Sequence, residues 1–458
     1  MLLHRCELDY LVEWYGRSDR KPLLMRGARQ VGKSTLVQLL AQKQGVRCVT
    51  VDFEHQAEDA ALFASKDPTT ILQLLSARRN ETLVPEQIIL FLDEVQNAPD
   101  VLQTLRYFYE KMPQLPVIAA GSLLDFPLRD IQFSMPVGRL EYLYVMPLGY
   151  EDFLAATQQT QLLAYLKNYT LDQSIPVPIH QQLMNTVKTY CLVGGLPQVV
   201  ASYRDNQDFR AVARHQKELL QSYQDDFAKY ATRAEQARMR TIFNKVPKIL
   251  GEKFKYSVID ANQQAASFKE ALEHLVLARI VQPVYHTAAN GVPLAAEVNT
   301  KYFKTYFLYV GLVSAALNVN VLDLQKATDL TLVNAGKIAE QFVAQTLLQV
   351  RELYEPPHLY YWIREEKSSA AELDFVIAIQ GQVIPIEVKA GATGSLKSLH
   401  YFLKEKNRTL GVRFCGQPPS VLQTTVQVQQ QEVPFTLLSL PFYLAGEAER
   451  LLSEVTSG

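Results

Sequence analysis

The chain contains, after the apolar residues 22–25, the stretch Gly27-Ala28-Arg29-Gln30-Val31-Gly32-Lys33-Ser34, which fits the phosphate-binding pattern GxxxxGK[ST]. The apolar run predicts a strand and residues 35–44 predict a helix, so the glycines fall on the turn between them. Such a loop directs main-chain N–H groups at a polyphosphate near the positive end of a helix. We expect it to bind a nucleoside triphosphate rather than to be a glycine-rich turn that holds a lysine. The residues expected to contact ATP are Gly27, Ala28, Arg29, Gln30, Val31, Gly32, Lys33, Ser34 and Thr35.

A second apolar run, at residues 88–92, ends in two acidic residues, Asp93 and Glu94. A continuous apolar run is typical of a strand that is buried on both faces of a parallel sheet. Asp93 is expected to hold Mg²⁺ together with Ser34, and Glu94 to polarise the attacking water. The alternative for Glu94 is an ordinary acidic residue that opens a loop.

Two further polar residues are predicted to lie near the phosphates. Residues 115–120 indicate another core strand, which brings Ser122 to the same edge of the sheet as a sensor of the γ-phosphate. Pro136 and Val137 precede Gly138 and Arg139, and the following residues, 140–146, indicate one more strand. Arg139 is expected to act as an arginine finger, in its own subunit or in a neighbouring one. An arginine paired with a surface carboxylate is the alternative.

Residues 1 to about 155 resemble the AAA-type ATP-binding domain of a large group of bacterial and archaeal proteins. The resemblance rests on GARQVGKST at residues 27–35, on LDEVQ at residues 92–96 and on Gly121-Ser122. The segment from Gly138-Arg139 to Pro147-Leu148 is also similar to that group. The resemblance implies that the chain binds and hydrolyses ATP with Mg²⁺.

Length and composition indicate several domains in a reducing compartment. The 458 residues with 48% hydrophobic content suffice for several cores, and the net charge of −1 offers no general attraction for nucleic acid. The four cysteines and eight histidines show no metal-ligand spacing, so no structural zinc is expected. No apolar stretch is long enough to span a membrane, and the start of the chain lacks the layout of an export signal. We therefore expect a cytoplasmic protein without membrane contact.

The middle of the chain is predicted to hold two modules. Apolar residues at helical spacing predict a helical lid over residues 156–240, interrupted by Gly194-Gly195-Leu196-Pro197, which is either a hinge or an ordinary helix-helix corner. Residues 241–330 predict helices followed by two strands around Asn290-Gly291, with the return strand starting at Pro293. This order favours a winged-helix-like segment, which binds duplex DNA in some proteins. A packing module is the equal alternative, because the basic residues form no dense run.

The last part of the chain, residues 331–458, contains a second group of acidic residues. Residues 372–379 and 383–389 predict two strands joined by a turn, so that Asp374 on one strand and Glu387 on the other converge. Lys389 shares a face with Glu387, and Glu340 lies on a preceding amphipathic helix. Carboxylate oxygens suit Mg²⁺ or Mn²⁺, and Lys389 is expected to orient a water toward a phosphodiester. The alternative is a solvated, charged hairpin face.

This arrangement resembles the PD-(D/E)xK restriction-endonuclease fold. It also matches the C-terminal domain of undefined function that commonly follows the ATPase domain named above. That resemblance implies catalytic roles for Asp374, Glu387 and Lys389 and metal binding by Glu340, Asp374 and Glu387. In one place the chain departs from the family, because Tyr309 stands where an acidic residue is usual.

The fold class expected is α/β, with a P-loop domain, a helical lid, a winged-helix-like middle and a C-terminal α/β restriction-endonuclease-like domain. The function expected is ATP hydrolysis coupled to a metal-dependent nuclease-like domain that acts on DNA. The alternative is an ATP-driven regulatory switch or interaction protein whose nuclease fold is inert. The partners expected are ATP, DNA, a further copy of the chain and a protein partner.

Overall fold

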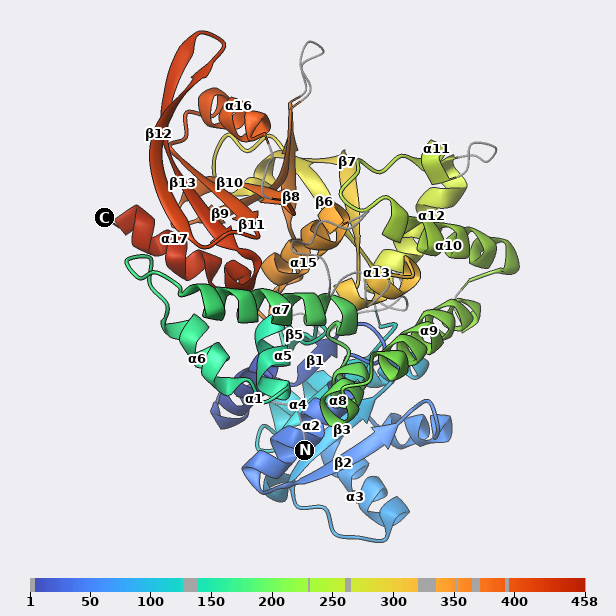
Figure 1. The fold of residues 1–458 in the computed structure, drawn as a ribbon. Helices are drawn as coiled ribbons and strands as arrows, with labels where there is room; N and C mark the ends of the chain where they lie inside the picture. Colours follow the sequence, from blue (N-terminus) through green and yellow to red (C-terminus); the bar gives the residue numbers. More distant parts are fainter. Residues whose placement is uncertain are drawn as a thin grey trace. The chain divides into compact units, whose positions relative to one another are not determined.

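The computed structural model describes residues 5–124, 126, 138–229, 231–259, 265–319, 335–350, 352–364, 371–391 and 395–457. The chain divides into two compact units (Figure 1). The first comprises residues 1–148, 277–280 and 351–357, and the second comprises residues 149–276, 281–350 and 358–458. Pro136, Val137 and the expected boundary between residues 330 and 331 lie outside the described residues.

The first unit is built on a five-stranded sheet in the order β2-β3-β4-β1-β5, in which all neighbouring strands are parallel. This confirms the parallel α/β fold expected for the P-loop domain. Strands β3 and β4 are almost entirely buried, which explains their continuous apolar sequences. The strands are β1 (Leu23–Arg26), β2 (Arg47–Asp52), β3 (Ile88–Asp93), β4 (Val117–Gly121) and β5 (Glu141–Tyr144).

The helices of the first unit begin and end at residues suited to those positions. Helix α2 follows Gly32, whose φ of 94° suits glycine, and it ends before Gly45, whose φ is 67°. Helix α3 is capped by the Asp67 side chain and starts with a proline. The helices are α1 (Cys6–Gly16), α2 (Lys33–Gln44), α3 (Pro68–Arg79) and α4 (Leu105–Lys111), with shorter 3-10 turns at η1 (Ala57–Phe63), η2 (Pro85–Gln87), η3 (Val95–Asn97) and η4 (Pro99–Thr104).

The second unit starts with the helices that were expected as a lid. Residues 156–240, predicted to be helical, contain the helices α6 to α9 and the first part of α10. The elements of this part are α5 (Tyr150–Ala156), α6 (Thr160–Asn168), α7 (Val177–Val193), α8 (Pro197–Asn206), α9 (Phe209–Asp226), η6 (Phe227–Lys229), α10 (Arg233–Lys245), η7 (Val246–Lys248), α11 (Tyr256–Ile259) and α12 (Ala265–Leu277).

The rest of the second unit is organised by an eight-stranded sheet in the order β12-β13-β11-β10-β9-β8-β6-β7 (Figure 1). Its strands are β6 (Val281–Thr287), β7 (Val298–Phe307), β8 (Tyr360–Ile363), β9 (Glu372–Ile379), β10 (Gln382–Lys389), β11 (Leu410–Cys415), β12 (Ser420–Val428) and β13 (Gln431–Pro441). The other elements are α13 (Val310–Ala316), α15 (Ala335–Gln349), α16 (Lys397–Glu405), α17 (Ala448–Ser457), η8 (Leu294–Glu297) and η9 (Phe442–Glu447).

The hairpin of β6 and β7 differs from the expectation in two ways. The return strand starts at Val298 rather than at Pro293, because Asn290 binds both carboxylate oxygens of Glu297 (2.9 and 3.0 Å) and residues between them form a 3-10 turn. The two strands also continue the large sheet through β8 instead of forming an independent wing. The winged-helix-like assignment stays a prediction.

The Gly194-Gly195 corner is packed tightly against the segment that follows β7. Gly194 has a φ of +73°, and a Cβ atom there would lie 2.2 Å from the ring of Tyr309. Tyr309 is fully buried, and its hydroxyl has no hydrogen-bond partner among the described residues. These contacts favour a fixed corner over a hinge.

We therefore predict that Gly194→Ala lowers the stability of the second unit by about 2–4 kcal/mol, because it combines an unfavourable φ with a steric clash. Gly291→Ala is the matched control, since a Cβ there meets nothing within 4 Å. Urea unfolding followed by circular dichroism compares the two variants with the wild type. Equal midpoints for Gly194→Ala and Gly291→Ala would contradict the packing described.

Candidate functional site

The phosphate-binding loop connects β1 to α2 in the first unit. Gly27 has no room for a side chain, because a Cβ atom would lie 2.3 Å from the carbonyl oxygen of Val145. The Lys33 ammonium donates hydrogen bonds to the carbonyl oxygens of Gly27 (2.9 Å) and Ala28 (3.0 Å). Lys33 thus lies against its own loop, at the first turn of α2, where the helix dipole favours an anion.

The environment of Lys33 weakens its hold on the proton. The residue is only 6% exposed, and burial lowers the pKa of its ammonium group to about 8. The negative charges of Glu94 and Asp93 offset part of this effect. The carboxylates at the end of β3 therefore partly stabilise the charged form of Lys33.

Ser34 and Asp93 join the two sequence motifs. The Ser34 hydroxyl donates to the Asp93 carboxylate at 2.6 Å, although the residues are far apart in the chain. Burial raises the pKa of Asp93, while the hydrogen bond from Ser34 opposes this shift. A hydroxyl and a carboxylate side by side form the pair of oxygen ligands that Mg²⁺ takes in P-loop proteins. The residues present therefore fit the ion that the P-loop implies.

Glu94 is held in place by two neighbours. Its φ of 50° puts it in the left-handed region. Its Oε2 atom accepts hydrogen bonds from the Ser122 hydroxyl (3.1 Å) and from the Gln96 side-chain amide. The structure thus brings the predicted base and the predicted sensor together.

Gln96 was not among the predicted site residues. Its side chain passes so close to β4 that a Cβ on Gly121 would lie 2.3 Å from Gln96 Oε1. Its position in the LDEVQ motif was the available signal. A side chain at position 121 would therefore displace the end of the Gln96 side chain.

Arg139 binds the carboxylate of Glu110 at 3.1 Å, and its side chain is 44% exposed. This contact is the surface pairing that sequence analysis gave as the alternative. The role of Arg139 as an arginine finger stays a prediction.

The second acidic group lies on β9 and β10 of the second unit. The two strands are antiparallel, and the main-chain N–H of Val388 donates to Asp374 Oδ2 at 2.7 Å. Lys389 donates to Glu387 Oε1 at 2.5 Å, so their side chains share a face. The site therefore spans two adjacent strands. In the antiparallel pairing Phe375 faces Ile386, and the site lies just beyond this pair: Asp374 comes before Phe375 on β9, and Glu387 and Lys389 come after Ile386 on β10.

Two residues of β7 complete this group and were missed by sequence analysis as site residues. Lys304 is buried, and its ammonium group lies 2.7 Å from Glu372, 3.3 Å from Glu340 and 3.8 Å from Asp374. Tyr306 donates to Glu340 at 2.5 Å. A single lysine within the aromatic run at residues 302–307 was the signal that could have found it. Glu340 is thus held by Lys304 and Tyr306, and its role as a metal ligand stays a prediction.

The charges of this group do not balance. Four carboxyl groups, those of Glu340, Glu372, Asp374 and Glu387, face only two ammonium groups, those of Lys304 and Lys389, so full ionisation would leave two negative charges in excess. Burial raises the pKa of Asp374 far above its usual range, and the charge of Glu340 raises it further. Burial also raises the pKa of Glu387, against the effect of Lys389. Burial alone would lower the pKa of Lys304, but the surrounding carboxylates outweigh it and raise that pKa.

A divalent cation fits two of these carboxylates. Glu387 Oε2 is buried and has no hydrogen-bond partner among the described residues. Together with Asp374 it offers the hard oxygen atoms that Mg²⁺ and Mn²⁺ prefer, and the ion would balance the excess charge. Within the described ranges, the cluster does not bring three acidic ligand atoms within 4.8 Å of one another, so water would supply the remaining ligands.

Family models match three separate parts of the chain. Residues 19–154 match the model described as "AAA domain". Residues 184–323 match "Domain of unknown function (DUF8612)" and residues 335–442 match "Domain of unknown function (DUF4143)". No curated protein matches the chain. The first unit therefore contains an AAA-type P-loop domain, as the sequence motifs predicted.

Solved structures add little to this assignment. The chain is similar to PCH-2 of C. elegans, at 10% identity and a TM-score of 0.27, over 45% of this chain and 65% of that one. It is also similar to the RuvB Holliday junction branch migration motor of Thermotoga maritima, at 13% identity and a TM-score of 0.28, over 62% and 90%. The chain thus spans less than two thirds of PCH-2, and TM-scores this low carry no argument. None of the helices in the described part of the chain is both long and apolar enough to cross a bilayer.

Lys33 attracts phosphate only in its charged form. We therefore predict that the affinity for MgATP falls as the pH rises through the Lys33 pKa of about 8. The dissociation constant should increase roughly tenfold per pH unit above that value, since bound phosphate stabilises the ammonium form. Calorimetric titrations between about pH 7 and pH 9.5 measure it. Lys43→Ala, in an exposed part of the same helix, should retain the dependence. An affinity that does not change with pH would contradict the buried position of Lys33.

Proposed function

We propose that the chain binds and hydrolyses ATP at the P-loop of its first unit. The observation that carries this proposal is the connected set Ser34, Asp93, Glu94 and Ser122, in which each residue contacts the next or follows it in the chain. The main-chain amides of the loop and Lys33 would bind the phosphates, and Ser34 and Asp93 would hold Mg²⁺. The bound ion would neutralise charge that develops on the phosphates.

In this proposal Glu94 is the residue that polarises the attacking water. Ser122 and Gln96 fix its carboxylate, so that its lone pairs have a defined direction when a water approaches. Ser122 links the γ-phosphate region to that base and can therefore sense the nucleotide. Arg139 would act from a neighbouring copy or from the same chain to stabilise charge in the transition state.

Glu94→Gln should retain MgATP binding and lower the turnover number by about 100- to 10,000-fold, because the amide cannot accept the proton of the water. A coupled assay of phosphate release gives the rate. Glu86→Gln, which changes an exposed carboxylate of the same unit, is the matched control. Turnover by Glu94→Gln at the wild-type rate would rule out Glu94 as the base.

We further propose that the acidic group of the second unit cleaves phosphodiester bonds in DNA. Support comes from Asp374 and Glu387 on adjacent strands, from the buried Glu387 Oε2 and from the larger number of carboxyl than ammonium groups in the cluster. These two carboxylates would hold Mg²⁺ or Mn²⁺, which would polarise a phosphodiester as a Lewis acid. Lys389, held by Glu387, would orient the water that attacks phosphorus.

Lys389→Ala should lower cleavage of DNA at least about 100-fold without changing ATP turnover, because it removes the group that orients the water. Lys397→Ala, an exposed lysine of the same unit, is the control. Plasmid and linear DNA are incubated with Mg²⁺ or Mn²⁺, with and without ATP, and separated on a gel. Undiminished cutting by Lys389→Ala would contradict the proposed role.

The same assay tests whether ATP drives cleavage. Loss of cutting in both Lys33→Ala and Lys389→Ala would couple the two sites, while loss in Lys389→Ala alone would indicate a nuclease that needs no nucleotide. Absence of cutting by every form, with ATP still hydrolysed, would favour the second candidate, a regulatory switch with an inert nuclease fold. The buried ion pairs of Lys304 are the observation that favours this candidate, because they neutralise carboxylates that a metal would otherwise use.

A further inference from the structure

A buried ion pair lies at the start of the first helix, ahead of the residues that match the AAA domain. Arg5 and Glu7 are each only 3% exposed. The guanidinium group donates to both carboxylate oxygens of Glu7, at 2.7 Å from Nη2 and 3.2 Å from Nε. A bidentate pair of this kind fixes the direction of the guanidinium. The matched domain starts only at residue 19, so no comparison gives this pair a role.

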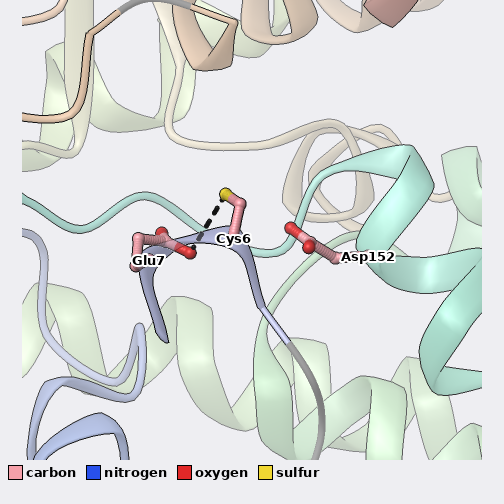
Figure 2. A group of neighbouring side chains, drawn as sticks. All are labelled: Cys6, Glu7 and Asp152. Carbon is pink, nitrogen blue, oxygen red and sulfur yellow. Dashed lines mark hydrogen bonds between the residues drawn. The ribbon is translucent and has the colours of Figure 1, made fainter. Parts of the chain in front are cut away.

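Figure 2 shows the surroundings of Glu7 at the start of α1. The Cys6 thiol donates to Glu7 Oε2 at 3.5 Å, so the carboxylate is held from both sides. Asp152, which is also labelled in the figure, belongs to the second unit, where its carboxylate accepts the N–H of Gly149 and caps α5.

The remaining donors of Arg5 bind two main-chain carbonyl groups of the first unit. Nη1 donates to the carbonyl of Val31 at 2.5 Å, and Nη2 donates to the carbonyl of Met146. Val31 belongs to the phosphate-binding loop, and Met146 follows β5, the strand that neighbours β1. One guanidinium group thus connects the loop to the segment that runs beside it.

This connection constrains the orientation of the peptide groups in the phosphate-binding loop, and that orientation determines whether their N–H groups point at a bound phosphate. A loop whose N–H groups point at a phosphate turns its carbonyl groups the other way, where they need donors of their own. Arg5 supplies such a donor to Val31, directly before Gly32 and Lys33. Without it, the loop would leave a buried carbonyl unsatisfied or would rotate the peptide, which also moves the N–H of Gly32.

We propose that Arg5 is a positioning residue for the nucleotide site and that Glu7 orients it. Arg5 does not contact ATP but holds the loop in the conformation that binds the triphosphate. The inference rests on the proposed binding of ATP. Only arginine can serve two separate carbonyl groups and a carboxylate at once, because its donors form a fork, whereas a lysine ammonium is a single point charge.

The test compares Arg5→Met, Arg5→Lys and Glu7→Gln with the wild type, by calorimetry with MgATP and by steady-state kinetics. Arg5→Met should raise the dissociation constant and KM at least about tenfold and leave kcat within about twofold, because the groups around Glu94 are untouched. Arg5→Lys should bind ATP more weakly than the wild type although it retains the charge. Glu7→Gln should show a smaller loss in the same direction.

Arg17→Met is the matched control. Arg17 also comes from the start of the chain and pairs with a carboxylate, Glu141, but at the opposite end of β5, which pairs with the start of β1. The dissociation constant of the Arg17→Met variant for MgATP should equal that of the wild type.

The outcomes separate this inference from the proposed function. If the wild type binds MgATP and Arg5→Met or Arg5→Lys binds it equally well, the inference is wrong while the ATP site stands. A fall in kcat at unchanged KM would also overturn it, because that result would give Arg5 a role in the chemical step. If Arg5→Met does not fold, Arg5→Lys and Glu7→Gln decide the same comparison. No binding by the wild type would contradict the proposed function itself.

Discussion

The hydrogen bond between the Ser34 hydroxyl and the Asp93 carboxylate, at 2.6 Å, joins the two halves of the nucleotide site. It connects the first turn of α2, the helix that follows β1, to the end of β3, and β4 lies between β1 and β3 in the sheet. Since all five strands are parallel, their carboxyl ends meet at one edge, and the loop, the acidic pair and Ser122 all follow strands that end there. The rest of the proposed chemistry depends on that shared edge.

In the second unit, a buried charged side chain joins the elements that carry the acidic group. Lys304 holds Glu340 from α15 and Asp374 and Glu372 from β9, and so ties a helix to two strands of the sheet. A buried ammonium group needs such partners because desolvation otherwise favours its neutral form. Carboxyl groups outnumber ammonium groups around Asp374 and Glu387. The proposed binding of a divalent cation rests on this surplus rather than on the hairpin pattern alone.

Sequence patterns predicted the local features of both units. The loop, the strand before it, the helix after it and the β9–β10 hairpin were placed within about two residues of their observed limits, because short-range periodicity and turn residues determine them. Lys304 and Arg5 were not predicted as site residues, because their partners include residues from distant segments. Arg5, for example, binds the carbonyls of Val31 and Met146, and no spacing in the chain indicates that contact.

The central claim is that the loop at residues 27–35 binds a nucleoside triphosphate through its amides and Lys33. Calorimetric titration of the purified full chain and of Lys33→Ala with MgATP at neutral pH tests it most directly. The account predicts saturable binding at one site in the wild type and its loss in Lys33→Ala, since the variant lacks the only ammonium group within the loop. No heat with the wild type, or the same affinity in both proteins, would contradict it.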